Sequence, residues 1–207
     1  MTISRLQAPI LALAAACLLA GCIGGAYRYQ MLDTEALRSR AETQTQGPIR
    51  VSAAVPGREE TASIYGIDLY DQGIQPVWLE IANSGDALAR YAPVSTDREY
   101  FAPLEVAYMN RGGYSDDARE SMNTRFRRLA MPRYIDPGET RSGFVLTHAD
   151  PGAKAFNVDV FSAGELRDFT FLLRVPGFKP DYARLDLPSM YTDEEIVDYE
   201  ADALQEP

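Results

Sequence analysis

Three carboxylates lie near aromatic side chains within residues 95–110, STDREYFAPLEVAYMN, which contain Asp97, Glu99, Tyr100 and Glu105. Two carboxylates beside aromatic rings can bind and hydrolyse glycosides, because the rings stack on sugars and the acids share the proton transfers. A proline turn separates Glu99 from Glu105, however, and sequence spacing does not give the distance between their carboxyl groups. We therefore interpret the stretch as an aromatic-rich loop with its acids in water, and name Asp97, Glu99, Tyr100 and Glu105 as its residues for ligand or partner contact.

The only histidine, His148, lies beside Asp150 in the turn sequence LTHADPG. A His–Asp pair needs a nucleophile to form a triad, and neither Ser142 nor Ser162 lies in a nucleophile-elbow pattern. A zinc site built on one histidine without a free cysteine is uncommon, and the ordered Asp-x-Asp-x-Asp-Gly calcium loop is absent from the sequence. We predict a solvent-exposed turn histidine and no enzyme: no catalytic residues, no metal and no cofactor.

The only tryptophan, Trp78, could either bind a ligand or fill a core. It lies in GIQPVWLEIANSGDA, with Val77 and Leu79 on either side and Pro76 before them. Apolar residues at successive positions indicate a strand that is covered on both faces. A large indole is also a known way to fill the space between two sheets. We predict that Trp78 is a core residue.

Short runs with period-two alternation predict the strands that position these groups. The runs cover residues 49–55, 64–69, 77–81, 143–147, 155–161 and 169–175. Turn sequences rich in Asn, Asp, Gly and Pro separate them. About seven strands with few helices predict a mostly β fold, an immunoglobulin-like antiparallel β-sandwich over residues 48–191.

One helix is predicted within this sandwich, at residues 115–129. Ser115 is a suitable N-cap, and two acids follow it in the first turn. Four apolar residues recur at helical spacing and form a narrow stripe: Ala118, Met122, Phe126 and Leu129. The arginines Arg119, Arg125, Arg127 and Arg128 fall on all sides of the helix rather than on one face. This distribution favours a solvated helix over a binding site for anions.

The N-terminus has one positive charge, Arg5, before a short apolar stretch that ends in Leu19-Ala20-Gly21-Cys22. Such a stretch is typical of an export signal. Its last four residues resemble the lipobox of bacterial lipoproteins, in which the cysteine is lipidated and the signal is cut before it. The resemblance implies a signal peptide at residues 1–21 and a membrane anchor at Cys22. An ordinary signal peptide and an uncleaved anchor are the alternatives.

The rest of the organisation follows from composition. Residues 22–47 are interpreted as the lipidated cysteine and a tether, and residues 192–207 as an acidic, solvated tail. Ile23 is not the aspartate that favours inner-membrane retention in enterobacterial lipoproteins, so the expected location is the outer membrane, facing the periplasm. A net charge of −10 gives no electrostatic footprint for nucleic acid.

Four runs resemble a bacterial domain associated with the LssY C-terminal group of envelope proteins: GIDLYDQGIQPVWLEIAN, YFAPLEVAY, PGETRSGFVLTHADPGAKAFNVDVF and FTFLLRVPGF. The likeness covers about residues 64–191 and implies an envelope location, but it supplies no catalytic residues. The architecture is also similar to that of short sandwich lipoproteins that tether secretion machines. We expect a non-enzymatic scaffold that is anchored through Cys22 and binds an envelope protein. The alternative is a binder or hydrolase of envelope glycans that uses residues 97–108.

Overall fold

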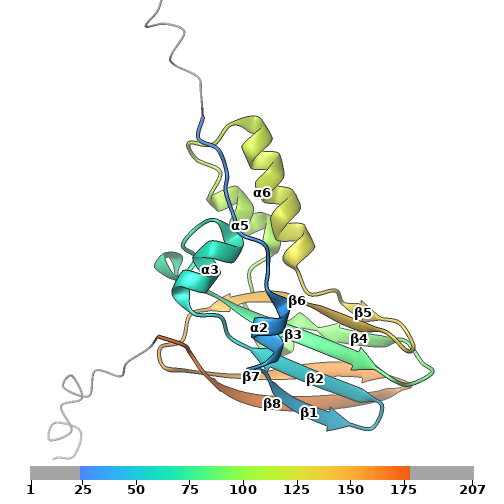
Figure 1. The fold of residues 1–207 in the computed structure, drawn as a ribbon. Helices are drawn as coiled ribbons and strands as arrows, with labels where there is room; N and C mark the ends of the chain where they lie inside the picture. The colour runs from blue at the N-terminus through green and yellow to red at the C-terminus, as the bar shows by residue number, and fades with distance from the viewer. Residues whose placement is uncertain (1–23, 178–207) are drawn as a thin grey trace, which may run out of the picture. The chain divides into compact units, whose positions relative to one another are not determined.

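The computed structural model describes residues 24–177, which form two four-stranded antiparallel sheets and several helices (Figure 1). Sheet 1 has the strand order β1 (Glu42–Gln46), β2 (Ile49–Ala54), β3 (Ile74–Asn83) and β6 (Thr140–His148). Sheet 2 has the order β5 (Tyr134–Ile135), β4 (Ala89–Ala92), β7 (Ala153–Ser162) and β8 (Glu165–Arg174). The predicted mostly β fold is therefore correct.

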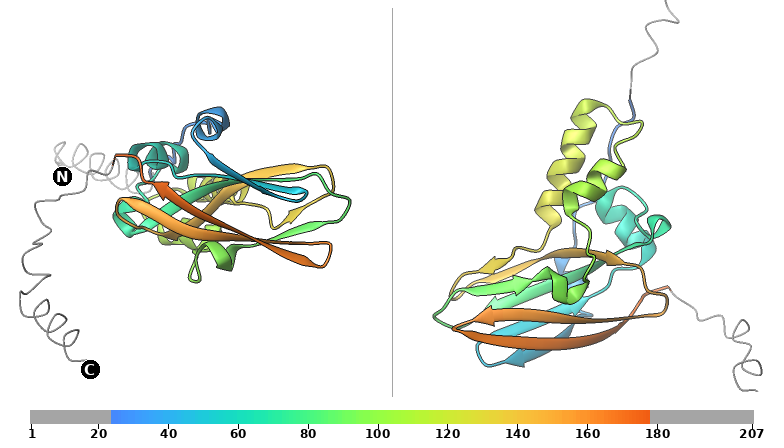
Figure 2. Two further views of the ribbon diagram at one scale, coloured as in Figure 1. Left: turned by 90° about the horizontal axis from the view of Figure 1, so that it is seen from below. Right: turned by 180° about the vertical axis from the view of Figure 1, so that it is seen from behind.

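The helices lie in two parts of the chain. α2 (Thr34–Arg38), α3 (Arg58–Tyr65) and the 3-10 turn η1 (Tyr70–Gln72) precede β3. α4 (Pro93–Thr96), α5 (Pro103–Met109) and α6 (Asp116–Leu129) form an insertion between β4 and β5. α5 and α6 make a hairpin that projects away from the two sheets (Figures 1 and 2).

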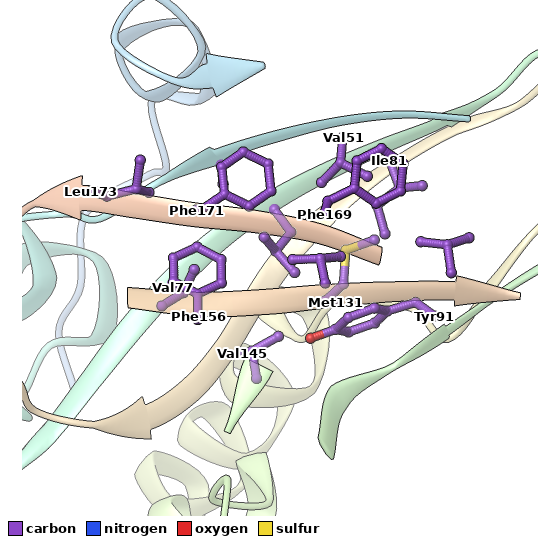
Figure 3. Close-up of a cluster of buried hydrophobic side chains, with 14 of the residues drawn as sticks. Val51, Val77, Ile81, Tyr91, Met131, Val145, Phe156, Phe169, Phe171 and Leu173 are labelled. Atoms are coloured by element: carbon purple, nitrogen blue, oxygen red, sulfur yellow. The ribbon is translucent and has the colours of Figure 1, made fainter. Parts of the chain in front are cut away.

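One hydrophobic core fills the space between the sheets (Figure 3). Alternate residues of each strand point into it, such as Val77 and Ile81 from β3 and Phe169 and Phe171 from β8. The rings of Phe156 and Phe171 stack with centroids 5.5 Å apart. This arrangement follows from the period of two in a strand, which places every second side chain on one face.

A second core lies on the other face of sheet 1, beneath the helical layer of α2, α3, α5, α6 and the segment 24–33. Trp78 belongs to this second core and has no exposed surface. The prediction that Trp78 is buried is therefore confirmed, but its expected place between the sheets is wrong. Val77 and Leu79 occupy the inter-sheet side, so alternation directs Trp78 toward the helices.

The helix prediction at residues 115–129 is confirmed by α6. Ser115 accepts a hydrogen bond from the Ala118 N–H, as an N-cap does. All four residues of the apolar stripe are buried in the second core. α6 projects away from the sheets, and only its C-terminal end approaches β6 (Figure 1).

Two segments differ from the sequence interpretation. Residues 64–69 do not form a strand: α3 ends at Tyr65, and Gly66 terminates it in the left-handed conformation with φ 70°. The segment expected to be a tether contributes α2 and β1, and its residues Tyr27 and Leu37 are buried in the second core. Cys22 and the acidic tail lie outside the described residues.

Candidate functional site

His148 pairs with Asp97 across 51 residues of sequence. Asp97 Oδ2 lies 2.9 Å from His148 Nδ1 and accepts the His148 backbone N–H at 2.8 Å. The ring of Phe101 lies against the imidazole, with centroids 4.8 Å apart. Asp150, the sequence neighbour that lies beside His148 in the turn, instead pairs with the buried Lys154 at 2.7 Å.

Asp97 is held ionised by these contacts. Burial acts to raise its pKa, but the hydrogen bonds from the backbone and ring of His148 and from the Glu99 N–H outweigh burial and lower the pKa below its ordinary value. A carboxylate on Nδ1 is the arrangement that orients histidine in a catalytic triad. Among residues 24–177, no serine, threonine or cysteine side chain is hydrogen-bonded to the imidazole.

The Asp97–His148 contact also covers the outer edge of β6. In the same insertion, the Phe101 N–H donates to Leu146 O at 2.8 Å and the Met131 N–H donates to Phe144 O at 2.9 Å. An uncovered strand edge offers free backbone groups to other chains. The contacts of Asp97 are thus explained by the need to fasten the insertion to β6.

The other predicted residues have separate partners. Glu105 Oε2 accepts from the Ala102 N–H at the start of α5, and Tyr100 Oη accepts from Arg133. Glu99 is exposed. The expected loop is in part the helix α5, because a proline at its first position and Glu105 in its first turn favour a helix start. The structure does not bring these carboxylates together as an acid pair.

A pocket of about 390 Å³ lies at the end of sheet 1 that carries the turn between β1 and β2. Its floor includes Arg50, Ala82 and Thr140, which are cross-strand neighbours on the face that also carries the helices. Glu139 lines it too, but is paired with Arg141 at 2.7 Å. The pocket holds no histidine and no pair of acids, so its chemistry is limited to hydrogen bonding and charge.

The outer face of sheet 2 carries a row of large exposed side chains that crosses all four strands. Tyr134, Arg90, Phe161 and Leu166 are successive cross-strand partners. Tyr134 is 58% exposed, Phe161 44% and Leu166 62%, and Arg90 lies over the Phe161 ring. We call these four residues the sheet 2 row. Sequence analysis did not identify this row. Leu166 could have indicated it, because it is an apolar residue on the face of β8 where alternation places mainly polar side chains.

Two carboxylates face each other next to this row. Asp159 and Asp168 are direct partners on β7 and β8, and burial together with the hydrogen bond to Asp168 raises the pKa of Asp159. Nowhere within residues 24–177 do three or more histidine, cysteine or acidic side chains form a group that could hold a metal ion. The two carboxylates repel each other when both are ionised, which agrees with the raised pKa of Asp159.

Arg125 differs from the other arginines of α6. It is buried, with Nε donating to Ile64 O at 3.0 Å and Nη2 to Gln30 O at 2.8 Å. Its guanidinium also lies 4.3 Å from the Tyr29 ring centre. The expectation of a solvated helix is thus wrong for this residue, because Arg125 joins α6 to α3 and to the N-terminal segment.

In the described part of the chain, no helix is long and apolar enough to cross a membrane. No protein-family model matches the chain, and a search of curated proteins finds none that is similar to it.

Proposed function

We propose that the chain is a lipid-anchored, non-enzymatic module of the cell envelope that binds another envelope protein through the outer face of sheet 2. The observation that carries this proposal is the sheet 2 row. Sheet 1 has its outer face largely covered by the helical layer, whereas the row on sheet 2 is exposed on every strand. Exposed apolar patches of this kind mark interaction sites.

The composition of the row favours a protein partner. Aromatic residues and arginine are enriched in the centres of protein interfaces. Arg90 forms no ion pair with any residue between 24 and 177. The complementary surface is therefore an apolar patch that carries a carboxylate for Arg90.

The anchor is proposed from the lipobox-like Leu19-Ala20-Gly21-Cys22. Two or more acyl chains hold a protein stably on a membrane, and the acidic chain itself gives no attraction to anionic lipids. Ile23 after the cysteine favours the outer membrane, facing the periplasm. Replacing Cys22 by Ser should move the protein to the soluble fraction, and unchanged partition would contradict the anchor.

An immunoglobulin-like fold is part of the proposal. The strand order supports it: β3 and β6 correspond to the central B–E pair of one sheet, and β4 and β7 to the C–F pair of the other. β2 and β8 then take the places of strands A and G. β5 lies beside β4 as an additional strand does in the larger members of this class.

Crosslinking pull-down from intact envelopes tests the interface. The double variant Phe161→Ser, Leu166→Ser should lose the crosslinked partner, because it removes two exposed apolar side chains of the row. Met31→Ser is the matched control, since Met31 is also exposed but lies before α2, in the helical layer. Equal capture by both variants would refute the assignment of the interface to sheet 2.

The alternative is a binder or hydrolase of glycans at residues 97–108. The exposed imidazole of His148 beside Phe101 gives this site one aromatic face and one titratable group. Replacing Glu99 or Glu105 by Gln should abolish hydrolysis of envelope glycans, with stability kept, if the site is an enzyme. A module of the proposed kind shows neither hydrolysis nor glycan binding.

A further inference from the structure

The beginning of the described chain is fastened to the tip of the α5–α6 hairpin. The Gly25 N–H donates to Gly113 O at 2.7 Å, and Gly25 O accepts from the Ser115 N–H at 3.3 Å. At Gly24, a Cβ atom would lie 2.5 Å from Ser115 N, so only glycine fits there without a shift. The chain therefore enters the domain at this tip, far from the two sheets (Figure 1).

The residues that follow hold this entry point in place. Tyr27 is buried in the second core, where its hydroxyl donates to Tyr65 O and its ring meets the Tyr114 ring edge to face. The Gln30 N–H donates a hydrogen bond to Ser63 O, and Gln30 O accepts one from the Arg125 guanidinium. Releasing the segment would expose part of the second core, so the entry point is a fixed feature of the fold.

The reach of the chain places the anchor close to the hairpin tip. Cys22 precedes Gly24 by two residues, and an extended chain spans at most about 3.3–3.6 Å per residue, so the two Cα atoms are within about 7 Å. The polar headgroup layer on each side of a bilayer is about 5–8 Å thick. A lipidated Cys22 therefore brings the tip to the headgroup layer.

The tip has the side chains suited to that layer. Tyr108 and Met109, at the C-terminal end of α5, are 61% and 56% exposed. The guanidinium of Arg111 lies 3.7 Å from the centre of the Tyr108 ring. Tyrosine is enriched at membrane interfaces, and arginine can cover apolar surface while its charge reaches phosphates.

We infer that the α5–α6 tip, with Tyr108, Met109 and Arg111, docks on the lipid surface and fixes the orientation of the domain. The inference rests on the proposed lipidation of Cys22. It adds a fixed orientation to the attachment, because a domain held only by a flexible tether would rotate freely. Docking at the tip places the α5–α6 hairpin between the membrane and the two sheets (Figure 1).

Depth-dependent quenching on vesicles tests the docking. The full-length lipidated protein carries a single introduced cysteine, Tyr108→Cys or Met109→Cys, labelled with bimane and bound to phosphatidylcholine–phosphatidylglycerol vesicles that contain a lipid with a nitroxide near the headgroup. Leu166→Cys is the matched control, because Leu166 is 62% exposed but lies on the outer face of sheet 2. We expect several-fold stronger quenching at positions 108 and 109 than at position 166.

Flotation of the same samples separates the two proposals. Protein that floats with the vesicles but shows equal, weak quenching at all three positions overturns the docking and leaves the anchor intact. Wild-type protein that does not float, and whose Cys22 reacts with the thiol label, overturns the anchor and the docking with it. Circular dichroism of each labelled variant excludes unfolding as the cause of altered quenching.

Discussion

Replacing Arg125 by Met should destabilise the protein by removing a buried charge that joins three segments. Each hydrogen bond to a charged group contributes about 1.5–3 kcal/mol, and Arg125 donates to Ile64 O and to Gln30 O. Burial lowers the pKa of Arg125, so relief of its desolvation offsets part of the loss. The expected net cost is about 2–4 kcal/mol, because the two carbonyls are left without this donor.

Denaturant unfolding followed by Trp78 emission measures this cost, because Trp78 lies in the same core as α6. For a chain of this size, each kcal/mol lost from the free energy of unfolding lowers the Tm by about 2–4 °C. Arg125→Lys should recover little, since an ammonium group lacks the planar fork that reaches both carbonyls. Arg128→Met is the matched control, because Arg128 is exposed on the same helix. A loss at Arg125 no larger than the loss at Arg128 would refute the reasoning.

Three further predictions follow from the sheets and the second core. Folding raises the pKa of Asp159, so stability falls as the pH rises from the unfolded to the folded pKa. Asp159→Asn should therefore increase the free energy of unfolding at neutral pH by up to about 1 kcal/mol, seen as a higher Tm, and should lose this advantage in acid. Trp78 emission should be blue-shifted and poorly quenched by iodide, because the side chain has no exposed surface, and emission like that of free tryptophan would contradict its burial. Gln44→Ala with Gln46→Ala should increase self-association in light scattering, since their side-chain amides donate to backbone carbonyls on the edge strand β8. An unchanged particle mass would contradict a protective role for these two side chains.

The parts of the fold that sequence predicted correctly are those with local causes. The helix at 115–129 has its N-cap, acidic first turn and apolar stripe within fifteen residues, so its prediction needed no tertiary information. Five of the predicted strands coincide with β2, β3, β6, β7 and β8 for the same reason. The prediction of a strand at residues 64–69 was wrong because a short apolar run fits the end of a helix as well as a strand. Gly66 favours the end of a helix, since it adopts the left-handed conformation after α3.

The contacts of the candidate site could not be predicted in the same way. Asp97 and His148 meet only because the insertion between β4 and β5 folds back along the edge of β6. Arg125 resembled its solvated neighbours in sequence, and its two carbonyl acceptors lie 61 and 95 residues away. Such pairings depend on the packing of whole layers, which residue spacing does not encode.

The order of the layers links the proposed anchor to the proposed interface. The helical layer covers one face of sheet 1, and sheet 2 packs on the other, so the sheet 2 row lies on the side of the domain opposite the helices. The chain enters at the tip of the helical layer, where a lipidated Cys22 would hold it. Docking there would hold the two sheets, and with them the row, away from the lipid, where a periplasmic partner can reach the row (Figure 1). Under these two proposals the uneven covering of the two sheets has a physical reason: the α5–α6 hairpin would supply the membrane contact, and the uncovered face of sheet 2 would supply the protein contact.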